Sequence, residues 1–184
     1  MKVFVPEKLS ELTLDRYLKI MDVPEDDPER GVKLLVAFLD IKEEEARGMD
    51  LESVQRVMPY LYKMMDADQQ DYGLQKLIEI DGVEYGFHPN LSNITVGEFV
   101  DLEYMCKDLN MNMTKFLSVV YRPLKTKGRG TYSIQPYKGG VEHEQFRQLT
   151  MDVVMGVLNF FLHIGLSLSN DLLKSSPEGR EAAT

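Results

Sequence analysis

The stretch from Leu77 to Phe87 reads Leu-Ile-Glu-Ile-Asp-Gly-Val-Glu-Tyr-Gly-Phe, with largely alternating apolar and polar residues on both sides of Asp81 and Gly82. Asp-Gly favours a two-residue type I′ turn, because both central residues of that turn need a positive φ. The stretch therefore predicts a β-hairpin. It lies near the middle of the 184 residues and separates two parts of the chain whose patterns are mainly helical.

The sequences on the two sides of this hairpin resemble each other at a constant offset. Residues 9–20 align without a gap with residues 91–102, sharing a leucine, a serine and a threonine, and residues 33–38 align with residues 115–120. Self-similarity of this kind is typical of a duplicated structural unit. The alternative is a pair of ordinary amphipathic helices with similar first turns.

Each unit is expected to begin with a short strand that ends at a proline, Pro6 or Pro89, because proline removes a backbone donor. A helix should follow, with Thr13 or Thr95 as its N-cap. Thr95 and Glu98 also have the spacing of a capping box. Apolar residues then recur at the spacing of one helix face. They are Leu14, Tyr17, Leu18 and Met21 in the first unit, and Val96, Phe99 and Val100 in the second.

Two further helices are expected in each unit, the second ones over residues 29–39 and 112–121. The third helix of the first unit should begin near Asp50 and be kinked or interrupted by Pro59. The third helix of the second unit should run from Thr150 through Leu168. The predicted fold is therefore mainly α with small β-hairpins (α+β). It has two related helical units, the second with an inserted β-hairpin or loop.

These patterns predict the organisation of the chain. An N-terminal helical unit takes residues 1–70, and the hairpin with the second helical unit takes residues 71–174. The second unit contains an insertion over residues 122–140, where glycines interrupt a run with strand character. Residues 175–184 are mostly small and polar and are expected to form a flexible tail.

The composition limits what the chain can do. Thirty acidic residues against 21 basic ones give a formal net charge of −9, whereas a general nucleic-acid binder needs a basic face. Hydrophobic residues make up 43% and charged residues 28%, as in a folded chain. A single cysteine, Cys106, excludes an internal disulfide and an all-cysteine metal site. The N-terminus shows no apolar leader, so a cytoplasmic setting is expected.

Motifs that would indicate catalysis do not stand out. The sequence has no glycine-rich phosphate loop and no Gly-x-Ser-x-Gly turn. Its three histidines are His88, His143 and His163, and the run Glu142-His143-Glu144 offers residue types that bind metals. Adjacent residues do not share one face of a helix or strand, so we interpret this run as a solvated turn. We expect neither enzymatic activity nor a cofactor nor a bound metal.

The segment from Met151 to Leu168 is apolar nearly all the way round a helix, so it must be buried on several sides. Polar residues interrupt it at three positions, which argues against a membrane span. One interpretation is a central core helix. The sharper one is that part of the segment contacts another protein chain, with Phe160 and Phe161 as the candidate contact residues.

The predicted insertion over residues 122–140 contains no acidic residue and five basic ones. A basic projection on an acidic body could be a solvated loop, a nucleic-acid contact, or a docking element for an acidic neighbour such as another copy of this chain. Only Tyr132 and Tyr137 could stack on bases, so a nucleic-acid partner is not favoured. The candidate partner-contact residues of the insertion are Arg122, Lys125, Lys127, Arg129 and Lys138.

Several of these runs resemble a recurring pattern in proteins of tailed bacteriophages. The runs are residues 80–102, 115–123 and 151–156, and Leu12-Thr13-Leu14 resembles the opening of the first helix in tail assembly chaperones. The resemblance implies a small, acidic, non-enzymatic helical protein of virion morphogenesis. Its leading implication is a tail assembly chaperone that binds apolar helices of a tape-measure-type partner. The shared motifs are structural and transfer no catalytic residue.

The same resemblance implies an alternative, a structural virion component such as a head–tail, tail or baseplate protein. Such a component would use its apolar surfaces for permanent symmetric contacts. An uncharacterised enzyme ranks third. A chaperone would act in the host cytoplasm during phage assembly, whereas a structural component would stay in the virion. In either case the expected partners are other phage proteins, with a homo-oligomer as a further option and no membrane.

Overall fold

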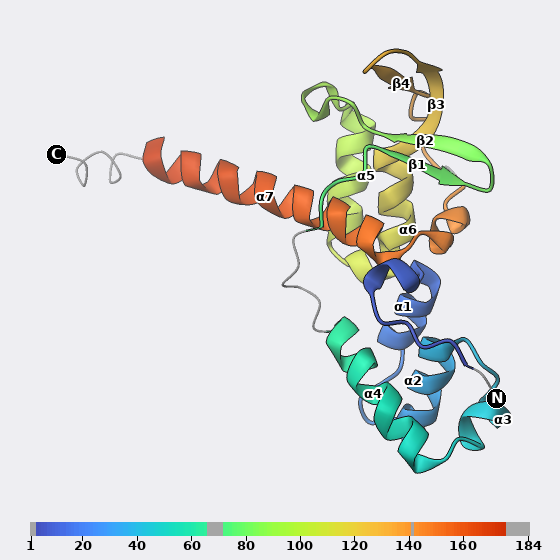
Figure 1. Ribbon diagram of the computed structural model, residues 1–184. Helices are drawn as coiled ribbons and strands as arrows, with labels where there is room; N and C mark the ends of the chain where they lie inside the picture. Colours follow the sequence, from blue (N-terminus) through green and yellow to red (C-terminus); the bar gives the residue numbers. More distant parts are fainter. Residues whose placement is uncertain (1–2, 66–71, 141, 176–184) are drawn as a thin grey trace.

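The computed structural model describes residues 3–65, 72–140 and 142–175, with residues 165–175 described by their backbone alone. Within these residues it contains seven α-helices and a four-stranded antiparallel sheet (Figure 1). The prediction of a mainly helical α+β fold is therefore confirmed. Apart from Ser175, the predicted tail lies outside the described residues.

The N-terminal part of the chain is built from helices. They are α1 (Leu14–Met21), α2 (Arg30–Leu39), α3 (Glu43–Arg47) and α4 (Leu51–Met65). The helix α4 continues through Pro59, so this proline does not interrupt it. The strand predicted to end at Pro6 is wrong, because residues 3–7 form no ladder with any described strand.

The sheet belongs to the C-terminal part and has the order β1 (Leu77–Ile80), β2 (Val83–Phe87), β3 (Tyr121–Lys127) and β4 (Tyr132–Ile134). The predicted hairpin is confirmed, since Ile80 pairs with Val83 across the turn. Asp81 and Gly82 have φ values of 51° and 77°, as a type I′ turn requires. The insertion contributes β3 and β4, and β3 pairs with β2, so its first half continues the sheet.

Three helices complete the C-terminal part. They are α5 (Val96–Cys106), α6 (Leu109–Val120) and α7 (Met151–Ser175). The helix α7 begins against the core and packs Phe161 on Phe116 of α6, with 5.4 Å between the ring centroids. Beyond this contact its backbone runs away from the rest of the molecule (Figure 1). Among the described residues, no helix combines the length and apolarity needed to cross a bilayer.

One local arrangement occurs three times in the described part of the chain. In each case a short 3-10 helix is followed by an apolar residue, a threonine and an α-helix. The three copies are η1 (Leu9–Glu11) with Thr13 before α1, η3 (Leu91–Asn93) with Thr95 before α5, and η4 (Glu144–Gln148) with Thr150 before α7. Thr13 and Thr95 accept hydrogen bonds from backbone N–H groups in the first helical turn, which confirms both as N-caps. The self-similarity of the sequence covers only two of these copies. Whether the chain contains a duplicated unit stays a prediction.

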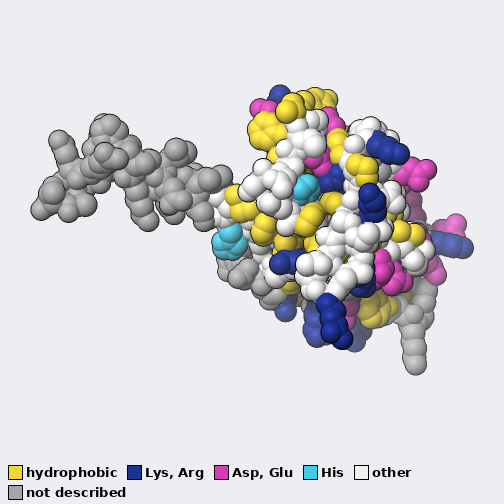
Figure 2. Space-filling model, turned by 90° about the horizontal axis from the view of Figure 1, so that it is seen from above, with side chains coloured by type: hydrophobic (Ala, Val, Ile, Leu, Met, Phe, Trp, Pro, Cys, Tyr) yellow, Lys and Arg dark blue, Asp and Glu magenta, His cyan; other side chains and the backbone are white. Residues whose placement is uncertain are grey.

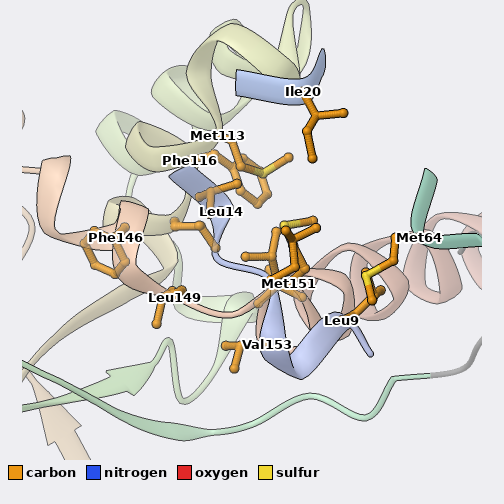
Figure 3. Close-up of a cluster of buried hydrophobic side chains, with 14 of the residues drawn as sticks. Leu9, Leu14, Ile20, Met64, Met113, Phe116, Phe146, Leu149, Met151 and Val153 are labelled. Carbon is orange, nitrogen blue, oxygen red and sulfur yellow. The ribbon is translucent and has the colours of Figure 1, made fainter. Parts of the chain in front are cut away.

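The first and third copies join the two parts of the chain. Thr13 and Thr150 form an antiparallel β-bridge. The N–H that follows each threonine donates to the carbonyl that precedes the other, at 2.7 and 2.8 Å. The apolar residues beside the bridge are buried, and Figure 3 shows Leu14, Leu149 and Met151 packed in the cluster between helices of both parts. The N-terminal and C-terminal helices therefore share one hydrophobic core.

Candidate protein-interaction surface

A buried ion pair fixes the first turn of α5 to the sheet. One carboxylate oxygen of Glu98, Oε2, accepts hydrogen bonds from the N–H and the hydroxyl of Thr95, at 2.7 and 2.6 Å. The other, Oε1, lies 2.6 Å from Arg122 Nη1 and 3.7 Å from His88 Nε2. The predicted capping box is thus confirmed, and its glutamate has a second function that the spacing did not reveal.

The electrostatics of this cluster follow from its burial. Burial raises the pKa of Glu98, but the hydrogen bonds from Thr95 and the charge of Arg122 outweigh it and hold that pKa below its usual value. Burial lowers the pKa of His88, against the opposing charge of Glu98. Glu98 is therefore ionised and His88 neutral near pH 7. Both oxygens of Glu98 contact groups that belong to the fold, so the cluster is positioned to hold α5 in place.

The structure corrects the prediction for Arg122. The sequence suggested an exposed residue at the start of a projecting insertion, whereas Arg122 is buried in β3, opposite Gly86 of β2. Its guanidinium lies between Glu98 and the ring of Tyr137, whose centroid is 6.0 Å away. An arginine held in this way is part of the interior and is not available to a partner. The chain passes directly from α6 into β3, and β3 pairs with β2. The basic residues of this segment do not reveal that pairing.

The other four predicted basic residues lie on the surface. Lys127 forms an ion pair with Glu84 of the neighbouring strand β2. The side chains of Lys125, Arg129 and Lys138 are exposed and form no ion pair with another described residue. That these residues contact a partner stays a prediction. They lie on the β3–β4 hairpin and on the segment that follows it.

The two predicted contact residues of α7 pack against the core. Phe160 makes edge-to-face contacts with Phe87 and with Phe161, at centroid distances of 5.2 and 5.6 Å, and the ring of Phe161 lies tilted to Phe87 at 6.2 Å. Both are only partly buried, and the next residue, Leu162, is well exposed. This aromatic cluster therefore anchors α7 at the point where its backbone leaves the body. A partner contact by these two rings stays a prediction.

Four of the exposed large apolar side chains lie on α5. Val96, Phe99, Val100 and Tyr104 are 81%, 57%, 52% and 66% exposed. Their spacing, i, i+3, i+4 and i+8, places them on one face of the helix. We call these four residues the apolar stripe. Leu102 lies on the opposite, buried face, which also carries Glu98. The helix α5 therefore has apolar side chains on both faces.

Sequence reasoning identified the helical spacing of this stripe but did not reveal that it faces solvent. The second apolar face of the helix could have revealed this exposure, because a helix that packs against a single core needs only one apolar face. Figure 2 looks onto the end of the molecule that carries the sheet and shows apolar side chains exposed among charged ones. Isolated exposed apolar residues are normal on protein surfaces, but a continuous row on a rigid helix indicates an interaction site.

Neighbouring contacts hold α5 in place beneath the stripe. The hydroxyl of Tyr137 donates to Asp101 Oδ2 at 2.6 Å, which ties the segment after β4 to the flank of α5. Burial and this hydrogen bond raise the pKa of Tyr137 to about 12, so the hydroxyl keeps its proton at physiological pH. With the capping box at one end and this tie near the middle, α5 presents the stripe in one fixed orientation.

The surroundings of His143 contain the residue types of a catalytic relay but not its geometry. This histidine borders a surface cavity of about 690 Å³, next to Lys115 and Ser118. The hydroxyl of Thr114 and Glu144 Oε1 lie 3.0 and 3.2 Å from the same ring nitrogen, Nδ1. A hydroxyl–histidine–carboxylate relay needs them on opposite nitrogens, so this geometry does not activate Thr114. Within the described ranges, no three His, Cys, Asp or Glu side chains gather as metal ligands.

Comparison of the chain with known protein families, with curated proteins and with solved structures gives no match. The functional proposal therefore depends on the chemistry of the molecular surface. The apolar stripe is the feature that the fold itself does not use.

Proposed function

We propose that this chain is a non-enzymatic protein-binding protein whose apolar stripe covers an apolar helix of another protein. The observation that carries the proposal is the exposure of four large apolar side chains on one face of α5. A row with this spacing is the surface that helix-on-helix recognition uses. A partner helix laid along it would remove all four side chains from water, which is favourable in proportion to the apolar area covered.

The more specific proposal is a tail assembly chaperone of a tailed bacteriophage, acting on helices of a tape-measure-type protein. The resemblance of the sequence to that class supports it. So does the net charge of −9, because like charges keep complexes apart and soluble. Met111, which is exposed at the start of α6, adds an adaptable apolar side chain of the kind that promiscuous binding surfaces use.

One observation favours the alternative of a structural virion component. The backbone of α7 continues as a helix away from the body. A projecting helix of this kind suits permanent insertion into an assembly. Mass spectrometry of purified virions separates the two functions. A stoichiometric amount of this chain in mature particles would contradict the chaperone and support the structural component.

Site-specific photo-cross-linking tests the stripe itself. A photoreactive amino acid at position 96 should cross-link to a protein with long apolar helices when chain and partner are made together. The same probe at Leu51, an apolar residue on α4 that is 72% exposed, is the matched control. Adding Phe99→Glu should abolish the cross-link from position 96, because a buried unpaired charge opposes helix docking. Equal cross-linking from both positions, or no effect of Phe99→Glu, would refute the proposal.

A further inference from the structure

Three positive charges on the β3–β4 hairpin and the segment after it form no ion pair with another described residue. Lys125, Arg129 and Lys138 are exposed, and no acidic residue occurs between positions 122 and 140. Lys127 differs, because Glu84 pairs with it. We call the three unpaired cations the basic end. Three exposed positive charges in one region of the surface can attract a negatively charged neighbour.

Negative charges without described ion pairs gather in the N-terminal part. Glu25, Asp26 and Glu44 are exposed, and none of them forms an ion pair with another described residue. Arg47 of α3 pairs with both Glu29 and Glu43, which brings the turn before α2 beside α3. That double pairing places the three unpaired acids on neighbouring segments. We call Glu25, Asp26 and Glu44 the acidic end.

The two ends lie on opposite sides of the molecule. Figure 1 places the β3–β4 hairpin at one extremity and α2 and α3 at the other. In a two-fold dimer residue i of one copy contacts residue j of the other and the reverse, so an antiparallel pair would also put each basic end on an acidic end, but it would lay the two net-negative bodies along each other. A head-to-tail contact joins the opposite charges at the ends and keeps the rest of the two bodies apart. Such a contact leaves one end of each pair unused and therefore continues into a ring or a filament.

We propose that copies of this chain associate head to tail, with the basic end of one copy on the acidic end of the next. A second copy is favoured over nucleic acid because the chain carries both complementary surfaces, whereas its net charge of −9 repels a polyanion. The same net charge opposes association at very low ionic strength. Association should be present near 0.1 M salt, where the Debye length is about 10 Å, and lost near 1 M, where it is about 3 Å.

This contact is independent of the apolar stripe. The stripe belongs to α5, and none of its residues is part of either charged end. A chain with Phe99→Glu should therefore lose the helix partner and keep self-association. Failure of the proposed helix binding would therefore not decide the proposed self-association, nor the reverse.

Sedimentation velocity of three variants tests the proposal. Variant A is Lys125→Gln, Arg129→Gln, Lys138→Gln, which removes the basic end. Variant B is Glu25→Gln, Asp26→Asn, Glu44→Gln, which removes the acidic end. The control is Lys8→Gln, Lys63→Gln, Lys76→Gln, because these lysines are also exposed and the net charge changes as in variant A.

The wild-type chain and the control should grow beyond dimers with concentration, whereas variants A and B alone should stay monomeric with unchanged helical circular dichroism. An equimolar mixture of A and B should form dimers and nothing larger, because only one competent contact remains. A wild type that is monomeric near 0.1 M salt would overturn the proposal, as would closed dimers or variants that associate like the wild type. The proposal would also be overturned if variant A associated normally but lost retention on a DNA column, since that result assigns the cations to nucleic acid.

Discussion

Arg122 Nη1 lies 2.6 Å from Glu98 Oε1, and the two side chains are only 6% and 2% exposed. The pair connects the third strand of the sheet to the first turn of α5. Because Glu98 also binds Thr95, the orientation of α5, and with it of the apolar stripe, depends on a charge contact that water does not reach.

Removal of one partner from this ion pair should be strongly destabilising. Arg122→Met leaves the carboxylate of Glu98 buried without its counter-charge, and we expect the free energy of unfolding to fall by about 3–5 kcal/mol. Urea unfolding followed by circular dichroism measures the loss. Lys125→Met, on the exposed part of the same strand, is the control and should change stability by less than about 0.5 kcal/mol. Equal effects of the two substitutions would show that the pair is not a determinant of stability.

Acid should destabilise the fold in two steps that belong to different residues. Burial lowers the pKa of His88, so below about pH 6.5 the unfolded chain takes up a proton that the folded chain resists. Despite burial, Thr95 and Arg122 lower the pKa of Glu98, so below about pH 4.5 the unfolded chain again binds the proton more readily. Stability should therefore fall as the pH drops through each window.

Two variants separate these steps. His88→Gln should flatten the dependence of the free energy of unfolding on pH just below about pH 6.5, and Glu98→Gln should flatten it below about pH 4.5. Urea midpoints measured across this range give both slopes. An unchanged slope in either variant would mean that the residue does not titrate differently in the folded and unfolded chains.

Gly86 should tolerate no side chain. A Cβ on this residue would lie 2.6 Å from the Tyr132 ring and 2.8 Å from Leu124, so Gly86→Ala must displace the ring whose hydroxyl donates to the carbonyl of Phe87. We expect a loss of about 1–3 kcal/mol in thermal or urea unfolding. Gly97→Ala is the matched control. Its Cβ would meet nothing within 4 Å, and alanine should stabilise the exposed helix α5 by up to about 1 kcal/mol.

The features that sequence reasoning predicted correctly depend on neighbours in the chain. The Asp81-Gly82 turn and the caps at Thr13 and Thr95 follow from the conformations and hydrogen bonds that a few consecutive residues prefer. The burial of Arg122 depends instead on which strands pair, and the exposure of Phe99 depends on which face of α5 meets the core. Composition does not contain the first fact, and periodicity shows apolar residues on both faces of α5 without telling which face meets the core.

The bridge between Thr13 and Thr150 leads to a prediction about cooperativity. It brings Leu14 from the N-terminal part and Met151 from the C-terminal part into one buried cluster, so neither part can open without exposing apolar surface of the other. Leu14→Ala should lower the free energy of unfolding by about 2–5 kcal/mol. It should also weaken both parts together, because a shared core unfolds as one cooperative unit.

Amide hydrogen exchange read by mass spectrometry distinguishes this outcome from local damage. With Leu14→Ala, exchange should accelerate in α6 as well as in α1 and α2, although α6 lies about a hundred positions later in the sequence. The control is Leu51→Ala on α4, which removes an exposed side chain and should leave exchange in α6 unchanged. Acceleration confined to the N-terminal helices would mean that the two parts open independently. In that case the bridge and its buried neighbours would join two separately stable units. A response on both sides of the bridge, by contrast, is explained only by a single shared core.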